Sequence, residues 1–365
     1  MTTRAPAKAA TVEGLVAGLR TFKPRDRSDV DGARRAGERN KLEQALHGAV
    51  AIEFATIPPY LTALWSIKDP LHPIAVSLRN IVQEEMLHLA LASNMLAAIG
   101  GTPKFTVMAP RYPATLPLGV HPELTVALQG FSGEALDIFL EIERPDSSDY
   151  QKWLAGAYDL VDQPHGADKT IGVFYDEIRK AFHCLDPTLC ADHQISGPLA
   201  WRVVKTLDDI NRAIGIITHQ GEGSRGGPVE GWGDRLAHFW RFAEMKELKK
   251  LVPDPTTGQR SFVTPIEFDM ARDVWPVGQV PAGGYGEVSD PEVCRLLRGF
   301  NVAYSELLDL FEAAWSQHDG QAMLVRAIAV MFALQEFAKP LMCIPRPDDD
   351  KTYGPEFRYL PTKER

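Results

Sequence analysis

The sequence is poor in cysteine and has no long apolar run. Its 365 residues include four cysteines, none of them in a Cys-x-x-Cys pair: Cys184, Cys190, Cys294 and Cys343. Such scattered cysteines predict reduced thiols and argue against a disulfide framework, so we expect a cytoplasmic protein. The longest apolar run, residues 327–334, is far shorter than the roughly 20 residues that a membrane-spanning helix needs. Residues 1–20 lack the apolar segment of a signal peptide.

Positive charge is also scarce. The chain has 39 Lys and Arg against 48 Asp and Glu, which gives a formal net charge of -9. Because phosphate binding requires a basic surface, this balance argues against a nucleic acid partner. The short basic cluster at residues 246–250 is typical of a solvated helix end. The chain also lacks the Gly-x-Ser-x-Gly elbow of serine hydrolases and the Gly-rich loop of P-loop nucleotide-binding proteins.

Apolar residues at helical spacing predict a mainly α protein. The clearest helix, residues 74–99, has no internal Gly or Pro, is apolar on most faces and stops at Gly100 and Gly101. Such a pattern is typical of a buried helix. The other expected helices cover residues 37–66, 133–143, 168–184, 205–220, 233–250, 291–317 and 320–339.

Prolines and glycines divide the chain. Pro58 and Pro59 interrupt the first expected helix, which either ends near Thr56 or continues bent to Ser66. Irregular Pro- and Gly-rich connections are expected at 100–131 and 251–291, the second with a short strand pair near 261–268. The predicted divisions are a flexible or loosely docked leader (1–36), a four-helix bundle (37–250) and a C-terminal helical region packed on the bundle (251–365).

A metal-binding pattern lies on the clearest helix. Glu85 and His88 are three residues apart, so their side chains share one face of the helix. Four-helix bundles hold two metal ions with one Glu from each of two helices and Glu-x-x-His from each of the other two. Glu84 competes for this role because Glu84 and His88 also share a face, but the metal pattern favours Glu85. A helical Glu-x-x-His can also be an ordinary surface pair.

Glu53 is a second candidate ligand. It follows four apolar residues and precedes Phe54, and glutamate is seldom buried unless it is paired. A metal ion would remove the penalty of burying such a carboxylate, and mixed nitrogen and oxygen ligands suit iron, manganese or zinc. The alternative is that Glu53 lies on an exposed stripe of its helix.

Several segments together resemble a known family. The main ones are residues 52–63 (IEFATIPPYLTA), 84–90 (EEMLHLA) and 98–103 (AIGGTP), and shorter matches follow at 112–117, 139–145, 170–175, 220–223, 236–242, 304–308 and 353–357. They resemble the ferritin-like domain of the iminophenyl-pyruvate dimer synthase family, which includes a domain of the violacein-pathway enzyme. The resemblance covers roughly residues 40–361 and implies a ferritin-like bundle.

The resemblance also implies a ligand set. Its members would be Glu53, Glu85, His88, Glu143, Glu222 and His238. A second Glu-x-x-His is missing, because Arg225 stands three residues after Glu222. His219 and Glu177 remain alternatives for a place in the set, with a structural role open for each.

The resemblance also implies a function. We expect a metal-dependent oxidase or oxygenase with two iron ions and dioxygen as a co-reactant. Its substrate would be a small amine, imine or amino-acid-derived compound from a biosynthetic pathway. Manganese or zinc are alternatives to iron. The chain lacks the additional large region of the violacein-pathway enzyme, so the same reaction is not assumed. Two rival hypotheses are an iron-handling protein without an organic substrate and a non-catalytic helical scaffold. The oligomeric state stays open, with a homo-oligomer as one option.

Overall fold

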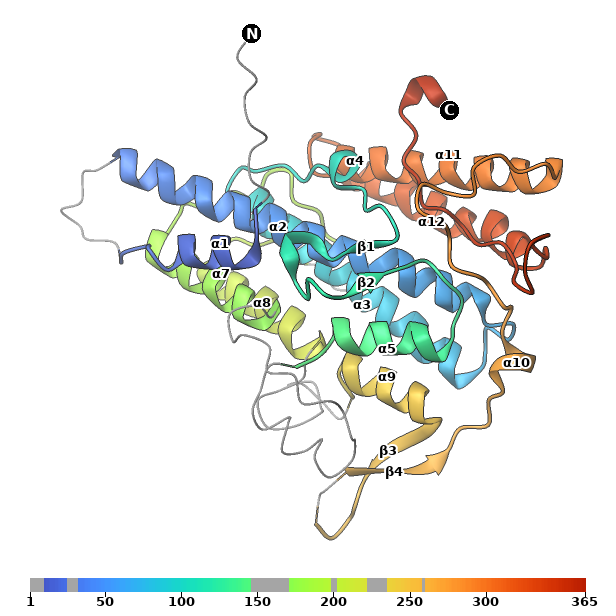
Figure 1. The fold of residues 1–365 in the computed structure, drawn as a ribbon. Coiled ribbons are helices and arrows are strands. Elements are labelled where there is room, and N and C mark those ends of the chain that lie inside the picture. Colours follow the sequence, from blue (N-terminus) through green and yellow to red (C-terminus); the bar gives the residue numbers. More distant parts are fainter. Residues whose placement is uncertain (1–9, 25–31, 146–170, 198–201, 222–234, 258–259) are drawn as a thin grey trace.

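The structure is a computed structural model that describes residues 10–24, 32–145, 171–197, 202–221, 235–257 and 260–365. Helices dominate it, as Figure 1 shows, so the prediction of a mainly α protein is confirmed. Two long helices, α2 (Gly32–Ser66) and α3 (Pro73–Ala98), pack against each other and run through the middle of the molecule. Both are buried over most of their length, which explains why their sequences are apolar on several faces.

Helix α2 continues through Pro58 and Pro59, so the second of the two alternatives is correct. A proline within a helix leaves the carbonyl four residues earlier without its usual N–H donor. For Pro59 that carbonyl belongs to Ala55, and the hydroxyl of Tyr112 donates to it at 2.7 Å. A tertiary contact therefore replaces the hydrogen bond that the second proline removes.

Two pairs of shorter helices cover one side of the α2–α3 pair (Figure 1). Helix α7 (Ile171–Leu185) packs with α8 (Leu207–Gly221), and α5 (Gly133–Ile142) packs with α9 (His238–Glu247). Helix α9 begins at His238 and ends before the expected residue 250, because residues 249–253 form strand β3 instead. Strand β3 (Lys249–Pro253) pairs antiparallel with β4 (Arg260–Pro265), close to the strand pair expected near 261–268.

The C-terminal helices lie on the opposite side of the α2–α3 pair. Helices α11 (Pro291–Ala314) and α12 (Gly320–Met342) form a hairpin there (Figure 1). By length and composition α12 is apolar enough to cross a membrane. Only 22 % of its most apolar stretch is buried in the fold, with Leu324, Ala327 and Leu334 among the buried residues, and one such helix is weak evidence of a membrane span.

Short elements connect these helices. They are α4 (Phe105–Met108), β1 (Ala114–Thr115), η1 (Pro117–Gly119), β2 (Thr125–Val126), α10 (Met270–Asp273) and η2 (Thr362–Glu364). Strands β1 and β2 pair antiparallel within the Pro-rich connection between α3 and α5. The expected irregular connections are therefore present, with only brief regular structure in them.

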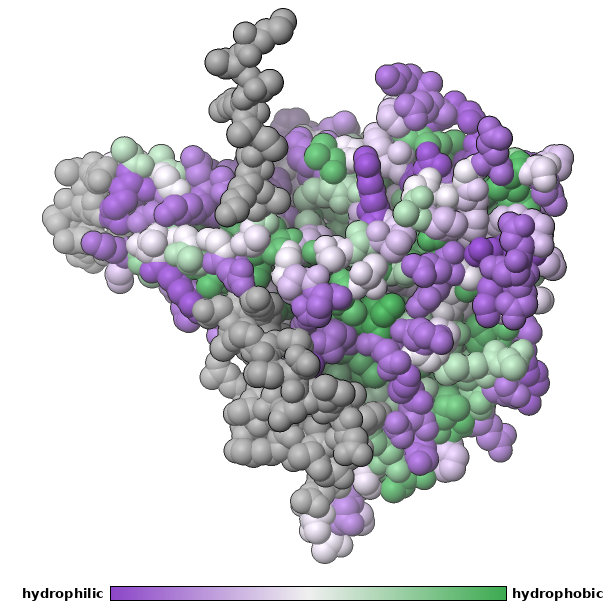
Figure 2. Space-filling model, viewed as in Figure 1, coloured by the Kyte–Doolittle hydropathy of each residue, from purple (hydrophilic) through white to green (hydrophobic). Residues whose placement is uncertain are grey.

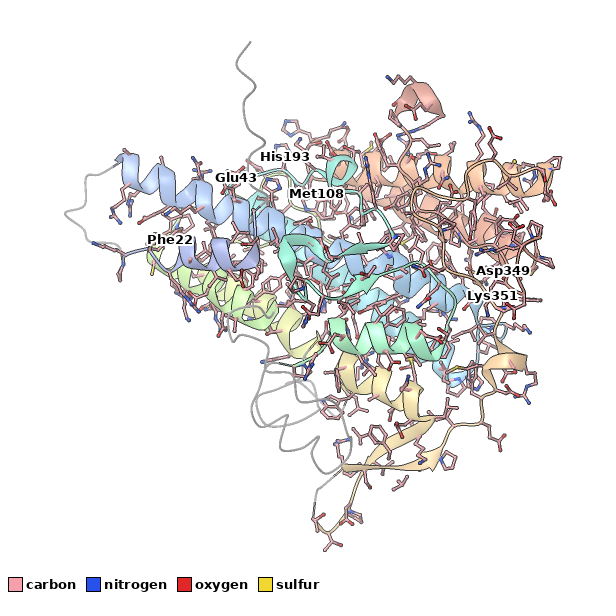
Figure 3. The ribbon with its side chains drawn as sticks, in the orientation of Figure 1. Phe22, Glu43, Met108, His193, Asp349 and Lys351 are labelled. Atoms are coloured by element: carbon pink, nitrogen blue, oxygen red, sulfur yellow. The ribbon has the colours of Figure 1, made fainter. Side chains whose placement is uncertain are left out.

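Part of the leader predicted for residues 1–36 is helical and docked on the bundle. Residues 12–19 form helix α1 (Val12–Leu19), which packs against α2 and α7. Val12, Val16 and Leu19 are buried, and Phe22, labelled in Figure 3, is also buried just after the helix. The spacing of the three aliphatic residues gives α1 one apolar face, and burial of this face holds the segment in place. Helix α2 also begins within the leader, at Gly32.

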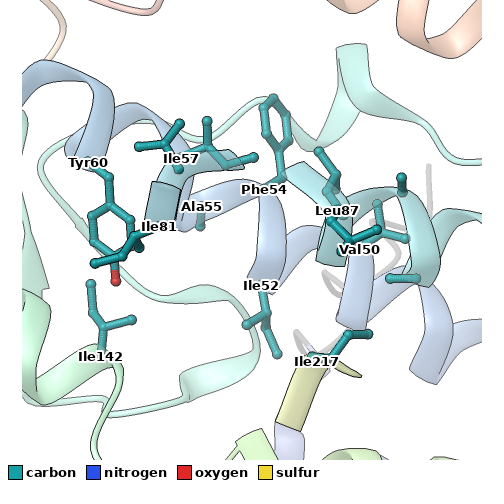
Figure 4. Packing of buried hydrophobic residues seen from close by; sticks show 14 of the residues in the cluster. Val50, Ile52, Phe54, Ala55, Ile57, Tyr60, Ile81, Leu87, Ile142 and Ile217 are labelled. Atoms are coloured by element: carbon teal, nitrogen blue, oxygen red, sulfur yellow. The ribbon is translucent and has the colours of Figure 1, made fainter. Parts of the chain in front are cut away.

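One contiguous apolar core joins the helices. Figure 4 shows Ile52 pointing from α2 toward Ile217 of α8, and Tyr60 pointing toward Ile142 of α5, while Phe54 points elsewhere. Helix α2 is therefore packed on more than one face. Hydrophilic residues cover much of the face seen in Figure 2, with smaller hydrophobic areas between them.

The docking of α1 can be tested by truncating Leu19, which is 3 % exposed. We expect Leu19→Ala to lower the free energy of unfolding by about 2 to 5 kcal/mol, as is usual for a buried leucine. Ala17, which is exposed on the same helix, provides the control, and Ala17→Ser should change stability by less than about 0.5 kcal/mol. Chemical denaturation measures both. Equal stability of the two variants would mean that α1 is not docked in solution.

Candidate metal centre

Three buried side chains from the two central helices form one cluster. Glu53 lies on α2, and Glu85 and His88 lie one turn apart on α3. Nδ1 of His88 is 3.6 Å from Oε2 of Glu53 and 3.4 Å from Oε1 of Glu85. All three residues are buried, so the alternatives of a surface pair and an exposed stripe are ruled out for them.

A second cluster shares Glu85 with the first. It adds Glu143, which caps the C-terminus of α5, and His238, the first residue of α9. Nδ1 of His238 lies 2.8 Å from Oε1 of Glu85 and 3.5 Å from Oε2 of Glu143. In each cluster the potential ligand atoms lie within 4.8 Å of one another. One oxygen of Glu85 therefore faces both imidazoles, as expected of a carboxylate between two cations.

Hydroxyl groups fix the other oxygen of each carboxylate. Tyr175 donates to Oε1 of Glu53 at 2.6 Å, and Tyr60 donates to Oε1 of Glu143 at 2.7 Å. Thr56 donates to Oε2 of Glu85 at 2.7 Å. Each carboxylate thus has one oxygen held by the protein and one oxygen that faces a histidine Nδ1.

Both imidazoles are held in the same way, by their outer nitrogen. Nε2 of His88 lies 2.8 Å from Oε1 of Gln220, near the end of α8, and Nε2 of His238 lies 3.0 Å from Oε2 of Glu84. The rings are stacked at 26° with their centroids 5.4 Å apart. Outer-sphere hydrogen bonds of this kind orient metal-binding histidines and fix the ring nitrogen that faces the ion.

The carboxylates of Glu84 and Glu85 have different partners. The carboxylate of Glu84 accepts hydrogen bonds from Arg241 and Arg235 as well as facing His238. Burial raises the pKa of Glu84, but the hydrogen bonds with His238 and Arg241 outweigh burial and lower it to about 2. Glu84 is therefore a charged support for the His238 ring, and Glu85 is the residue that faces into both clusters.

The buried charges shift the protonation of the clusters strongly. Burial raises the pKa of Glu53, whereas the nearby imidazoles of His238 and His88 outweigh burial at Glu85 and lower its pKa. Burial lowers the pKa of His88, but Glu53 and Glu85 outweigh it and raise the pKa to about 10. The carboxylates likewise raise the pKa of His238 well above its ordinary value, against the effect of burial. The surroundings therefore favour positive charge at both imidazole positions.

The donor set fits two metal ions of the kind that four-helix bundles bind. Mixed carboxylate and imidazole ligands suit iron, manganese or zinc. Nδ1 of His238 is fully buried and has no hydrogen bond of suitable geometry to any described residue, which leaves this nitrogen for an ion. A cation would also replace the protons that the buried imidazoles otherwise carry.

Two of the remaining sequence candidates, Glu177 and His219, do not join the clusters. Glu177 lies on α7, where its carboxylate pairs with Lys180 at 2.9 Å and with Arg20 at 3.3 Å. His219 lies on α8 beside Gln220 and belongs to neither group of potential ligands. Glu222 lies outside the described residues, so its predicted role as a ligand stays a prediction.

The ferritin-like family model matches residues 46–247, more than half of the chain and the region that contains all these groups. The chain belongs to the ferritin-like family. A crystal structure of a ferritin-like protein from Caulobacter vibrioides is similar to this ferritin-like chain, with a TM-score of 0.54 and 20 % sequence identity. The match covers 87 % of this chain and 97 % of the Caulobacter protein. At this identity the likeness supports the fold alone, and it confirms the predicted ferritin-like architecture. No curated protein matches the chain.

Several supporting residues were not predicted. Tyr60 and Tyr175 were not among the predicted site residues, yet each donates to a cluster carboxylate. Gln220 and Arg241 were not singled out, although an arginine within the aromatic run HFWRF is a signal of a buried ion pair. The partners of these residues lie on other helices, far away in the sequence.

The support of Glu84 can be tested with two arginines that pair with the same carboxylate. The side chain of Arg241 is 7 % exposed and that of Arg235 is 60 % exposed. Arg241→Met should lower the free energy of unfolding by about 3 to 5 kcal/mol, because Glu84 stays buried without its main partner. Arg235→Met should cost less than about 1 kcal/mol. Denaturation of both variants measures the difference, and equal losses would contradict this assignment.

Proposed function

We propose that this chain is a metal-dependent oxidoreductase with a di-iron centre formed by Glu53, Glu85, His88, Glu143 and His238. One observation carries the proposal: three carboxylate oxygens and two imidazole Nδ1 atoms converge in a buried site, with Oε1 of Glu85 common to both clusters. Glu222 is proposed as a sixth ligand from the family resemblance. Bound iron would supply electrons for the reduction of dioxygen and would accept electrons from the substrate that is oxidised.

Hydrogen bonds from neighbouring side chains hold the proposed ligands in the orientation that binding two ions requires. Tyr175, Thr56 and Tyr60 each hold one carboxylate oxygen, so that the other oxygen stays directed at the centre. Glu84 and Gln220 hold the imidazole rings from outside. Since both sets of supports are hydrogen bonds from other helices, the ligands are oriented by the fold itself.

The resemblance to the iminophenyl-pyruvate dimer synthase family supports a substrate class. We propose a small amine, imine or amino-acid-derived compound from a biosynthetic pathway, oxidised in the cytoplasm. The described residues at the cluster enclose a small cavity of about 30 Å³, with Ile52, Ile142 and Ile217 in its wall beside Glu53 and Glu85. These isoleucines would exclude water and favour an apolar group on the substrate.

The size of this cavity also favours a second candidate, iron oxidation without an organic substrate. A cavity of about 30 Å³ has room for roughly two or three water molecules, which suits dioxygen better than an amino acid. A carboxylate-rich site is equally suited to iron as a substrate.

Metal stoichiometry tests the proposed centre. After anaerobic loading with ferrous iron and removal of free metal, we expect two iron ions per chain by elemental analysis. Glu85→Ala should lose both ions, because this carboxylate faces both clusters, whereas Glu53→Ala should retain one. Glu177→Ala is a matched control: this glutamate is buried on a bundle helix, but its partners are Lys180 and Arg20.

The control should retain both ions. Circular dichroism of each variant distinguishes a lost ligand from a lost fold. A Glu85→Ala protein that folds and still holds two ions would overturn the proposed centre, and so would a wild-type protein that takes up no iron.

Oxygen consumption separates the two functions. If iron is a cofactor, oxygen uptake by the loaded protein should be catalytic only with an amine or imine compound present, and iron should stay at two ions per chain. If iron is the substrate, excess ferrous iron alone should sustain oxygen uptake over many turnovers. An oxygen electrode and a ferric-iron assay measure both quantities in the same sample.

A further inference from the structure

A polar cavity of about 370 Å³ lies between three segments that are far apart in the sequence. Its lining residues fall within 106–112, which include the end of α4, within 280–284 of the second irregular connection, and within 356–359 near the C-terminus. Helix α4 packs against α11, so the cavity adjoins the C-terminal hairpin. No residue of the two proposed metal clusters lines it, and it is therefore a separate site.

The hydroxyl groups in the wall of this cavity already have acceptors. Thr106 and Tyr359 donate to carboxylates of α11, at 2.8 Å and 3.0 Å respectively. The hydroxyl of Tyr112 donates to the carbonyl of Ala55 on α2. The hydrogens of all three hydroxyls are therefore used within the fold.

The carboxylate of Glu356, the one acidic side chain that the described residues contribute to this wall, is also engaged. It is buried, and its Oε1 accepts from the backbone N–H of Tyr285 at 2.8 Å. Its Oε2 accepts from the side-chain amide of Asn301 at 2.7 Å. The backbone of Gly284 lies so close to this carboxylate that a Cβ there would collide with Oε1. Glu356 therefore ties the irregular connection to α11, and both of its oxygens have a donor.

Two arginine side chains in the wall remain. Arg111 is exposed, and its guanidinium makes no hydrogen bond or ion pair with any residue that the structure describes. Arg358 is half-exposed, and its guanidinium lies 3.7 Å from Oε2 of Glu356, beyond hydrogen-bond distance. The wall thus carries two positive charges against one negative charge, in a chain whose formal net charge is -9. Because its unused side-chain donors are both cationic, the cavity is complementary to an anion.

The size and the remaining surface of the cavity define the anion further. Ligand sites commonly have volumes of roughly 300 to 1,000 Å³, so a cavity of about 370 Å³ can hold a small metabolite as well as an inorganic ion. Pro110, Pro281 and Phe357 supply apolar surface in the same wall. An organic skeleton would bury this apolar surface, which a hydrated inorganic ion would leave in contact with water.

We propose that this cavity binds a small organic dianion, with its anionic groups held by Arg111 and Arg358 and its skeleton packed on Phe357 and Pro281. Guanidinium groups bind carboxylates and phosphates through paired N–H···O hydrogen bonds, so a phosphate monoester and a dicarboxylate share the required chemistry. The proposal is independent of iron binding and of the reaction at the metal centre.

Four probes test the class of ligand by isothermal titration calorimetry on the full-length protein. They are phenyl phosphate, succinate, inorganic phosphate and the neutral benzyl alcohol. We expect at least one of the two organic dianions to bind, with an affinity that falls as salt is added. Inorganic phosphate should bind at least about tenfold more weakly than this dianion, because it buries no apolar surface, and benzyl alcohol should not bind. Tighter binding of phenyl phosphate identifies a phosphate monoester as the ligand class, and tighter binding of succinate identifies a dicarboxylate.

Three arginine variants test the location of the site. Arg111→Gln and Arg358→Gln should each raise the Kd of the tighter organic dianion by about tenfold, the usual effect of one hydrogen bond between charged groups. Arg298→Gln is the matched control, because Arg298 is exposed on α11 and does not line the cavity, and it should leave the Kd unchanged. Circular dichroism checks that each variant is folded.

The proposal is overturned if neither organic dianion binds, or if benzyl alcohol binds as tightly as they do. It is equally overturned if folded Arg111→Gln and Arg358→Gln proteins keep the wild-type Kd, or if Arg298→Gln loses as much affinity as they do, since the anion would then bind elsewhere.

Discussion

The burial of four glutamates beside two histidines is the constraint on which the rest of this fold depends. Glu53, Glu84, Glu85 and Glu143 are all less than a tenth exposed, and a buried carboxylate without compensation is among the most costly groups in a protein. Every one of them has a hydroxyl, imidazole or guanidinium partner. The arrangement of the helices follows from the need to bring these partners together.

This need explains why the helices that cover one side of the α2–α3 pair are short. Glu143 caps the end of α5, Gln220 is near the end of α8, and His238 begins α9. A single long helix in place of α5 or α9 would carry its side chains past the centre at fixed spacing. Helix ends allow side chains from several chain directions to meet at Glu85, so the breaks in the outer helices position the site.

Site residues that share one helix could be predicted from their spacing, whereas residues brought together by the packing of different helices could not. Glu85 and His88 share a helix, so their spacing alone indicated a common face, and Glu53 was a polar exception in an apolar run. Glu143 and His238 are 95 residues apart and meet only through the packing of α5 with α9, so they could be proposed only from the family resemblance. Helix α1 was missed because three buried aliphatic residues in a polar segment give a weak signal. The course of α2 through Pro58 and Pro59 depended on Tyr112, 53 residues beyond Pro59.

The two central helices serve different chemistry on their two sides. On one side, Glu53 and Glu85 face the charged cluster, and on the other, their sequence neighbours Phe54 and Met86 line an apolar cavity. A helix that divides a charged site from an apolar one must be covered on both sides, which accounts for the C-terminal hairpin beyond the bundle. Without α11 and α12, the apolar side of α2 would be open to water. The cost of this exposed apolar surface would then disfavour the position of α2 that brings Glu53 to the cluster. The hairpin therefore contributes to the metal centre through the helices it covers, although none of its residues touches the cluster.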